Sequence, residues 1–139
     1  MADVVKIAEE ISIIMPRISR QIMSDLFTTV DIPHAQLFVI MTLFHTGSCR
    51  TCDIGRQLKV TAPTATGIVD RLEKAGYVSR STDQEDRRTV MVNLTVEGKK
   101  LALRVKDKVV ERWADLLQKI PAEDAEKYLE ILHKIKEAL

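Results

Sequence analysis

The chain has 139 residues, of which 45% are hydrophobic and 29% are charged, and its formal net charge is only +1. This composition is that of an ordinary folded protein, and it argues against a mainly disordered chain and against a strongly basic one. The charge is unevenly spread, however, because residues 50–100 carry ten Lys or Arg against seven Asp or Glu. No run of 18 apolar residues and no signal peptide is present, so we expect a cytoplasmic protein that does not span a membrane.

Residues 4–27 predict one long amphipathic helix, because apolar residues recur at spacings of three and four. Pro16 interrupts this pattern, and we expect the helix to kink or break there. The polar face mixes acidic and basic residues, so we expect the apolar stripe to form a dimer core rather than to lie on a membrane surface. The stripe consists of Val4, Ile7, Ala8, Ile11, Ile14, Met15, Ile18, Ile22 and Leu26.

Residues 33–45 predict a second helix, which is apolar enough to be largely buried. Asp31 or Ile32 would lie near its cap, Pro33 fits its first turn, and Gly47 would end it. The residues expected in the core are Leu37, Phe38, Ile40, Met41 and Phe44.

Residues 52–59 and 62–75 predict two further helices joined by a tight turn, which is a helix-turn-helix arrangement. Thr51 and Thr61 are the expected caps, and Gly76 is the expected stop. The second helix of such a unit enters the major groove, where its N-terminal residues reach base edges. Hydroxyl groups there bond bases or phosphates and methyl groups contact thymine, although threonines at a helix start also act simply as caps. The candidate contact residues are Thr61, Ala62, Pro63, Thr64 and Thr66.

The same helix contains Gly67, which lowers helix stability by about 1 kcal/mol relative to Ala. We attribute this glycine to the close approach of a backbone or a neighbouring helix. The expected buried face of the helix consists of Ile68, Val69, Leu72 and Ala75.

The hydrophobic period then changes to two over residues 77–82 and 89–94, which predicts two strands. Six polar residues, 83–88, separate them, so we expect a β-hairpin with a charged, exposed tip. Arginines inserted into a narrow minor groove are a known means of binding DNA, and Arg87 and Arg88 lie at this tip. The alternative is a solvated turn in which Asp86 pairs with an arginine.

The C-terminal part predicts two more helices. Thr95 would cap the first, which should run to about Ile120, and Pro121 forces a boundary before the second. The last helix carries an apolar stripe, and Trp113 and Tyr128 are expected to be packing residues of the long terminal helices. The helices at both chain ends have too little chain around them to bury their stripes, so we expect a second copy to cover them. The last stripe consists of Ala125, Tyr128, Leu132, Ile135 and Leu139.

Residues 32–36 and 60–78, Asp86-Arg87-Arg88, and Val92-Asn93-Leu94-Thr95 followed by Gly98 resemble the MarR (multiple antibiotic resistance regulator) family of winged helix-turn-helix regulators. The resemblance implies a mainly helical single domain over residues 1–139, with dimerisation helices at 1–30 and 100–139 and a winged DNA-binding lobe at 31–99. It further implies a homodimer that binds palindromic double-stranded DNA. We expect this homodimer to be a repressor, and we expect a small lipophilic or phenolic effector to release it from the DNA.

The resemblance also implies roles for individual residues. Arg88 would enter the minor groove with Asp86 orienting it, and Arg87 would meet phosphate. Arg71 and Arg80 would contact the DNA backbone.

Cys49 and Cys52 form a lone C-x-x-C, with His45 nearby, for which a zinc or redox role is one interpretation. A second C-x-x-C or a helical pair of histidines is missing, so we expect simply two small residues near a short strand before the helix at 52–59. Some relatives sense oxidants through a cysteine in the first helix, where this chain has none.

Two other functional classes compete with DNA binding. The sequence lacks a Gly-rich phosphate loop, G-x-S-x-G and H-E-x-x-H, so we expect no enzyme, no cofactor and no metal. A winged helix that binds only protein is the remaining alternative, and the arginine-tipped wing favours DNA over it.

Overall fold

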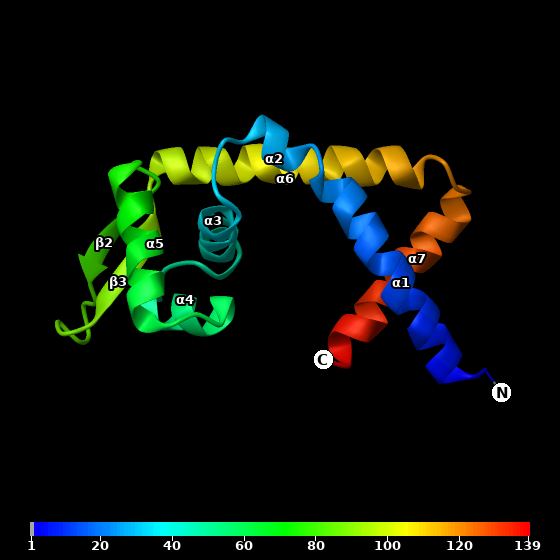
Figure 1. Cartoon of the computed structure of the whole chain (residues 1–139), viewed down its shortest axis with the longest axis horizontal. Helices are drawn as coiled ribbons and strands as arrows, with labels where there is room; N and C mark the ends of the chain where they lie inside the picture. The colour runs from blue at the N-terminus through cyan, green and yellow to red at the C-terminus, as the bar shows by residue number, and fades with distance from the viewer. Residues whose placement is uncertain (1) are drawn as a thin grey trace. The chain divides into compact units, whose positions relative to one another are not determined.

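The computed structural model describes residues 2–139, and it is mainly helical with one small antiparallel sheet, as the sequence predicts. The elements shown in Figure 1 are α1 (Val4–Met23), α2 (Leu26–Thr29), α3 (His34–Thr46), β1 (Cys49–Arg50), α4 (Thr51–Leu58), α5 (Ala62–Lys74), β2 (Val78–Thr82), β3 (Val90–Leu94), α6 (Val96–Leu117) and α7 (Ala122–Glu137).

The chain divides into two compact units, which differ in charge. The lobe is Phe27–Lys106, and the arm unit combines residues up to Leu26 with Asp107–Leu139. The lobe carries twelve Lys or Arg against eight Asp or Glu, a net charge of +4, whereas the arm unit carries nine against twelve, a net charge of −3. The small total charge therefore conceals a basic lobe.

The sheet of the lobe is a hairpin of β2 and β3 to which β1 adds a third strand, in the order β1-β3-β2. Val78 pairs with Leu94 and Arg80 pairs with Val92, which also pairs with Cys49 of β1. The lobe core beneath the sheet and helices is apolar, since its largest fully buried side chains come from α3, α4, α5, β3 and the start of α6. They are Val39, Ile40, Ile54, Val69, Leu72, Val92 and Leu101.

Three local capping signals hold where the sequence places them, whereas the N-cap of α4 is Arg50 and the predicted cap, Thr51, is the first residue of the helix. The Thr61 hydroxyl accepts a hydrogen bond from the Thr64 amide at 3.4 Å, and Gly76 leaves α5 with a φ of +85°. The Thr95 hydroxyl accepts from the Gly98 amide at 3.1 Å and donates to the Gly76 carbonyl at 2.6 Å. Thr95 thus caps α6 and also fastens it to the end of α5.

Two predicted helix boundaries are wrong. α1 continues through Pro16 without a break and ends at Met23, after which α2 forms a separate short turn. An internal proline removes one backbone hydrogen bond, and the remaining bonds of this 20-residue helix carry it across. α6 ends at Leu117, before Ile120.

Two predicted burial assignments are also wrong, and the close approach expected at Gly67 is not found within the chain. Phe38 of α3 is 49% exposed, whereas Val39 and Leu43 of the same helix are buried, and Ala75 at the end of α5 is exposed. α3 is apolar on nearly all sides, so periodicity alone could not select its buried face. A Cβ on Gly67 would meet nothing within 4 Å, so no close neighbour within the chain accounts for this glycine.

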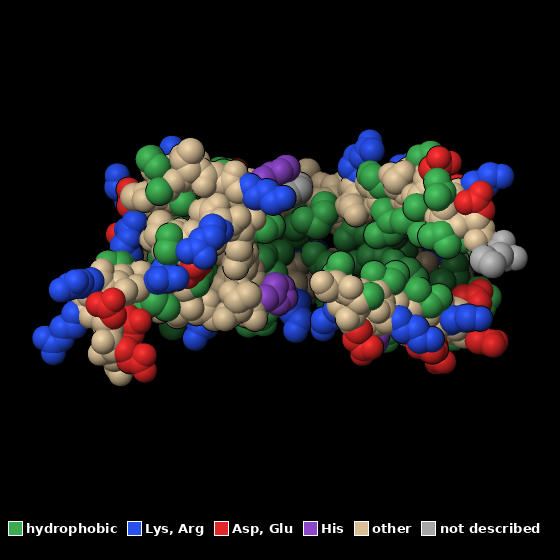
Figure 2. All heavy atoms as spheres, turned by 90° about the horizontal axis from the view of Figure 1, so that it is seen from below, with side chains coloured by type: hydrophobic (Ala, Val, Ile, Leu, Met, Phe, Trp, Pro, Cys, Tyr) green, Lys and Arg blue, Asp and Glu red, His purple; other side chains and the backbone are tan. Residues whose placement is uncertain are grey.

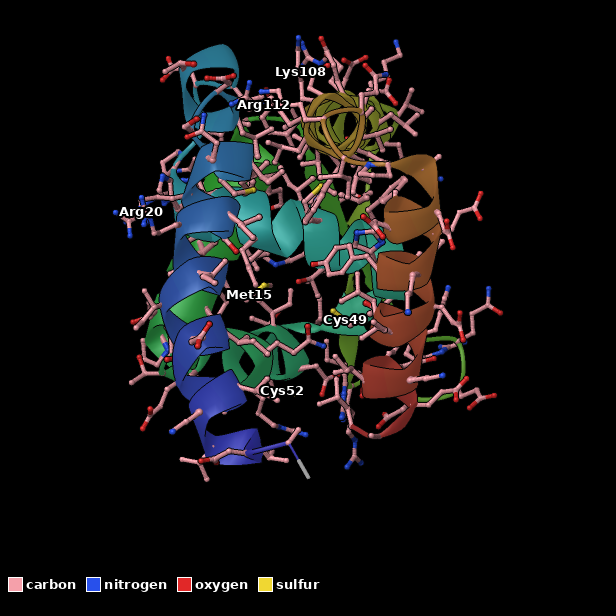
Figure 3. All side chains as sticks on the ribbon, turned by 90° about the vertical axis from the view of Figure 1, so that its right-hand side faces the viewer. Met15, Arg20, Cys49, Cys52, Lys108 and Arg112 are labelled. Atoms are coloured by element: carbon pink, nitrogen blue, oxygen red, sulfur yellow. The ribbon has the colours of Figure 1, made fainter. Side chains whose placement is uncertain are left out.

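The arm unit joins α1 and α7 to the second half of α6. Arg112 of α6 forms an ion pair with Asp25 at 3.2 Å and donates to the Gln21 carbonyl at 3.1 Å, which ties α6 to the end of α1. The rings of Trp113 and Tyr128 lie 6.2 Å apart, so these two residues pack together where α6 meets α7. α1 and α7 cross in Figure 1 but stand apart in Figure 3, so they do not cover each other.

Most of the apolar surface of the arm unit is open to solvent. α7 has no buried residue and α1 has only Ile22. Figure 2 shows the resulting field of hydrophobic side chains on one face of the arm unit. A cleft of about 410 Å³ also opens there, lined by Trp113, Leu117, Ala125, Glu126, Tyr128, Leu129 and Leu132. Over residues 2–139, no helix is both long and apolar enough to cross a membrane.

Candidate nucleic-acid interface

α4 and α5 form a closely packed helix-turn-helix. Lys59 leaves α4 with a φ of +56°, and the Val60 amide bonds the Gly55 carbonyl at 3.0 Å, so the turn is tight. A Cβ built on Gly55 would lie 3.4 Å from Cβ of Ala65, which shows how closely the two helices approach. This packing buries one side of α5 and leaves its N-terminal turn exposed.

The exposed first turn of α5 contains a pair of threonines that share one hydrogen bond. The hydroxyl oxygens of Thr61 and Thr64 are 2.9 Å apart, and the Thr61 hydroxyl also caps the helix. A hydroxyl offers one donor and two acceptor positions, so each threonine retains capacity for an external partner. Ala62, Pro63 and Thr66 are also exposed.

A second feature of α5 is an outward stripe of residues at spacings of three and four. Thr64, Gly67, Arg71 and Lys74 lie along one side of a helix with 3.6 residues per turn. Arg71 and Lys74 are exposed, and neither forms an ion pair within the part of the chain that the structure describes. This side of α5 therefore presents two cations without an ion-pair partner among the described residues. At Gly67, no atom lies within 4 Å of the position that a Cβ would occupy.

Arg80 has a different environment from Arg71. Its guanidinium lies 2.6 Å from the carboxylate of Asp70 and 2.8 Å from that of Glu73, so it bridges β2 to α5. Its side chain is only 25% exposed. In the structure, therefore, Arg80 is paired with two carboxylates, whereas the family resemblance implied that it contacts the DNA backbone.

The wing tip between β2 and β3 is held by its own hydrogen bonds. The Asp83 amide bonds the Thr89 carbonyl at 2.9 Å, which closes the loop. Asp86 accepts from the Arg88 amide at 3.0 Å and from the Thr89 hydroxyl at 3.2 Å. Asp86 therefore orders the backbone of Arg88, and it pairs with neither arginine side chain. Arg87 and Arg88 are exposed and without an ion pair among residues 2–139.

The base of the wing is fixed by an amide that the sequence did not single out. Asn93 of β3 donates to the Ser81 hydroxyl at 2.9 Å and to the Ser79 carbonyl at 3.4 Å, and its carbonyl oxygen accepts from Ser48. Asn93 therefore links β3 to β2 and to the segment before β1, and these hydrogen bonds hold the base of the hairpin in place.

A further group of cations at α4 was also missed. Arg50 and Arg56 both pair with Asp53, at 3.2 and 3.7 Å, and the Arg56 side chain is 74% exposed. The hydrogen bond from Arg50 lowers the pKa of the Asp53 carboxyl. Lys59 is exposed in the turn that follows. The sequence could have indicated these cations as candidate phosphate contacts. They lie in or beside the first helix of the helix-turn-helix and the turn that follows it, and that helix crosses the DNA backbone.

The two cysteines lie at the junction of β1 and α4. Cys49 is half-buried and Cys52 is exposed. Burial, with the nearby Asp53 and Cys52, raises the pKa of the Cys49 thiol, which disfavours the reactive thiolate. Among the residues that the structure describes, no three His, Cys, Asp or Glu side chains cluster as a metal site would require.

Residues 32–90 match the sequence model of the MarR family. The chain is 40% identical to the uncharacterized HTH-type transcriptional regulator YfiV of Bacillus subtilis, over 52% of this chain and 45% of that protein. It is 37% identical to the HTH-type transcriptional regulator FarR of Neisseria gonorrhoeae, over 60% of this chain and 57% of that protein. The chain thus spans about half the length of these curated relatives.

Solved structures match nearly the whole chain. A MarR family protein from Bacillus stearothermophilus superposes with a TM-score of 0.86 over 99% of this chain and 97% of that one, at 20% identity. Transcriptional regulator Tm0710 from Thermotoga maritima superposes with a TM-score of 0.70 over 97% and 92%, at 25% identity. The structural similarity therefore includes the winged helix-turn-helix and also the helices that flank it.

Proposed function

We propose that this chain, whose residues 32–90 match the model of the MarR family, is a cytoplasmic, sequence-specific DNA-binding transcription regulator that acts as a repressor. The observation that carries the proposal is the set of unpaired cations on the lobe. Arg71 lies on the open side of α5, and Arg87 and Arg88 lie at a hydrogen-bonded wing tip. Two cationic projections from a lobe of net charge +4 suit a duplex, whose phosphates carry closely spaced negative charge.

The contacts that we propose divide into readout and positioning. The first turn of α5 would read base edges in the major groove through Thr64, with Thr61, Ala62, Pro63 and Thr66 alongside. Arg88 would enter the minor groove, and Asp86 would set its direction by ordering the backbone at the tip. Arg71 and Arg87 would contact phosphates, and Arg56 adds a cation in the first helix of the motif.

We further propose that the chain works as a homodimer through the arm unit. Apolar side chains along α1 and α7 are 47–57% exposed in the single chain, including Ile7, Ile11, Ile14, Leu129 and Ile135. Contiguous apolar surface of this kind marks an interface, and a second copy offers the matching surface. A two-fold dimer of lobes would bind an inverted repeat.

Release from DNA by a small lipophilic or phenolic effector is the final part of the proposal, and the family resemblance supports it. Titration of phenolic ligands against a preformed protein–DNA complex is the test, and ligand-dependent dissociation is the expected result.

DNA binding itself is tested by selecting bound duplexes from a random pool and then measuring affinity for the selected site. Arg88→Ala should raise the Kd roughly tenfold or more, about 1–3 kcal/mol, without altering folding. Arg20→Ala in the arm unit, where Figure 3 shows the side chain pointing outward, is the matched control and should bind like wild type. Equal affinity of the Arg88→Ala protein would remove the wing from the proposal. A pool from which no duplex is retained would favour the alternative, a winged helix that contacts only protein.

A further inference from the structure

Two carboxylates stand on the helix that is proposed to enter the major groove. Asp70 and Glu73 lie three residues apart on α5, and their side chains are 52% and 44% exposed. Negative charge at a surface that faces phosphates opposes binding. We therefore expect a nearby positive charge that offsets the charge of these two carboxylates.

Arg80 of β2 supplies that feature. One of its terminal nitrogens lies 2.6 Å from Asp70 and the other lies 2.8 Å from Glu73. A guanidinium is a planar fork of fixed geometry, so two simultaneous charge-assisted hydrogen bonds restrict direction as well as distance. Because its two partners are one helical turn apart, the fork limits both rotation of α5 about its axis and movement of α5 away from β2.

The chain around this bridge transmits the restraint to the wing. Only Ala75, Gly76 and Tyr77 separate α5 from β2, and the Tyr77 amide bonds the Leu72 carbonyl at 3.0 Å. Arg80 pairs with Val92 in the ladder, so β3 is registered to the strand that carries the bridge. The bridge therefore sits where the helix, the first wing strand and the second wing strand are mechanically joined.

We propose that Arg80 is a positioning residue, which holds the recognition helix and the wing in one relative orientation and offsets part of the negative charge of the two α5 carboxylates, without contacting a phosphate. This inference rests on the proposed DNA binding, and it replaces the phosphate contact that the sequence suggested. Partly solvated ion pairs contribute little to folding stability, so the effect of Arg80 should be seen in DNA affinity rather than in unfolding.

A thermodynamic cycle separates positioning from phosphate contact. Arg80→Gln should raise the Kd for the selected site about three- to tenfold, as expected for coupled charged groups, with an unchanged dependence on salt. In the Asp70→Asn/Glu73→Gln background, the same substitution should change the Kd less than about twofold, because its partners are gone. Arg71→Gln is the matched control. It should weaken binding equally in both backgrounds and reduce the salt slope by about 1.

The contrary result is an Arg80→Gln protein that loses about 1 from the salt slope and loses the same affinity in both backgrounds. Arg80 would then be an independent phosphate contact, and the inference would be overturned.

A second readout needs no DNA. Hydrogen exchange of the amides in β2 and β3 should be faster in the Arg80→Gln protein and unchanged in the Arg71→Gln protein, and equal exchange in both would overturn the restraint. If wild-type protein retains no duplex, the proposed function fails. The exchange measurement still decides whether Arg80 holds the helix to the wing.

Discussion

At the residue scale, Thr64 combines a role in helix capping with a place at the proposed DNA surface. Its amide is capped by Thr61, and its hydroxyl lies 2.9 Å from the Thr61 hydroxyl. Thr64→Val keeps the shape and the capped amide but removes the hydroxyl. We expect folding to be retained and discrimination among substituted half-sites to change locally, by about 1–3 kcal/mol at the contacted base pair.

Thr66→Val is the matched control, because residues 64 and 66 point about 200° apart on a helix. Binding measured on a panel of duplexes with single base-pair changes distinguishes the two variants. A Thr64→Val protein with the wild-type preference at every position would show that its hydroxyl reads no base.

Residue-scale predictions succeeded where the signal is local and failed where it depends on tertiary placement. Thr61, Gly76 and Thr95 were identifiable because a cap or a stop is decided within a few residues. The partners of Arg80 are seven and ten residues away on another element, and nothing in the sequence selects them over solvent. Asp86 was expected to orient the Arg88 side chain by pairing with it, but its contact is with the Arg88 backbone amide, which charge complementarity does not predict.

At the element scale, α6 approaches the end of α5 so closely that only glycine fits at the contact. A Cβ on Gly98 would lie 2.1 Å from the Tyr77 carbonyl oxygen and 3.0 Å from Leu94. Backbone cannot yield as a flexible side chain does, so Gly98→Ala should lower the free energy of unfolding by about 1–3 kcal/mol. Urea titration followed by circular dichroism measures this change.

Gly67→Ala is the contrasting substitution, since a Cβ there meets nothing within 4 Å. It should raise stability by about 0.5–1 kcal/mol, because alanine is the better helix former. If Gly98→Ala were as stable as wild type, the close approach of α6 to Tyr77 would not exist in solution.

The elements themselves were largely predictable because their periods differ. The change from a period near 3.6 to a period of two marks the wing, and the two strands lie within one residue of their predicted ranges. α3 shows the limit of this method, since a segment apolar on all sides carries no information about which side is buried. β1 is only two residues long, and its pairing with β3 depends on partners that lie 41 and 43 residues away in the sequence.

At the scale of the whole molecule, the exposed apolar faces of the arm unit predict association. Ile11 of α1 is half-exposed in the single chain, so Ile11→Asp should leave the fold of each chain intact but place a charge in the dimer core. Analytical ultracentrifugation should show a monomer at concentrations where wild type is a dimer. Glu9→Lys, on the polar side of the same helix, should remain dimeric, and a stable dimer of the Ile11→Asp protein would exclude α1 from the interface.

Because the positive charge is concentrated in the lobe, the salt dependence of DNA affinity is the most direct test of a two-lobe DNA-binding dimer. We propose that about three cations per lobe, Arg56, Arg71 and Arg87, meet phosphates. For about six phosphates in total, log K should fall with log salt concentration at a slope near −5. The inverted repeat should have half-site centres about 10 base pairs apart, so that both recognition helices lie on one side of the duplex.

The decisive measurement is the affinity for this repeat across a series of salt concentrations, repeated on a duplex with five base pairs inserted between the half-sites. Insertion turns one half-site to the opposite side of the helix, and dimer binding should be lost. A slope near −5 on the original repeat and loss of binding on the inserted one is the expected result. Full affinity for the inserted duplex, or a slope near zero, would contradict a dimer that reads DNA with two winged lobes.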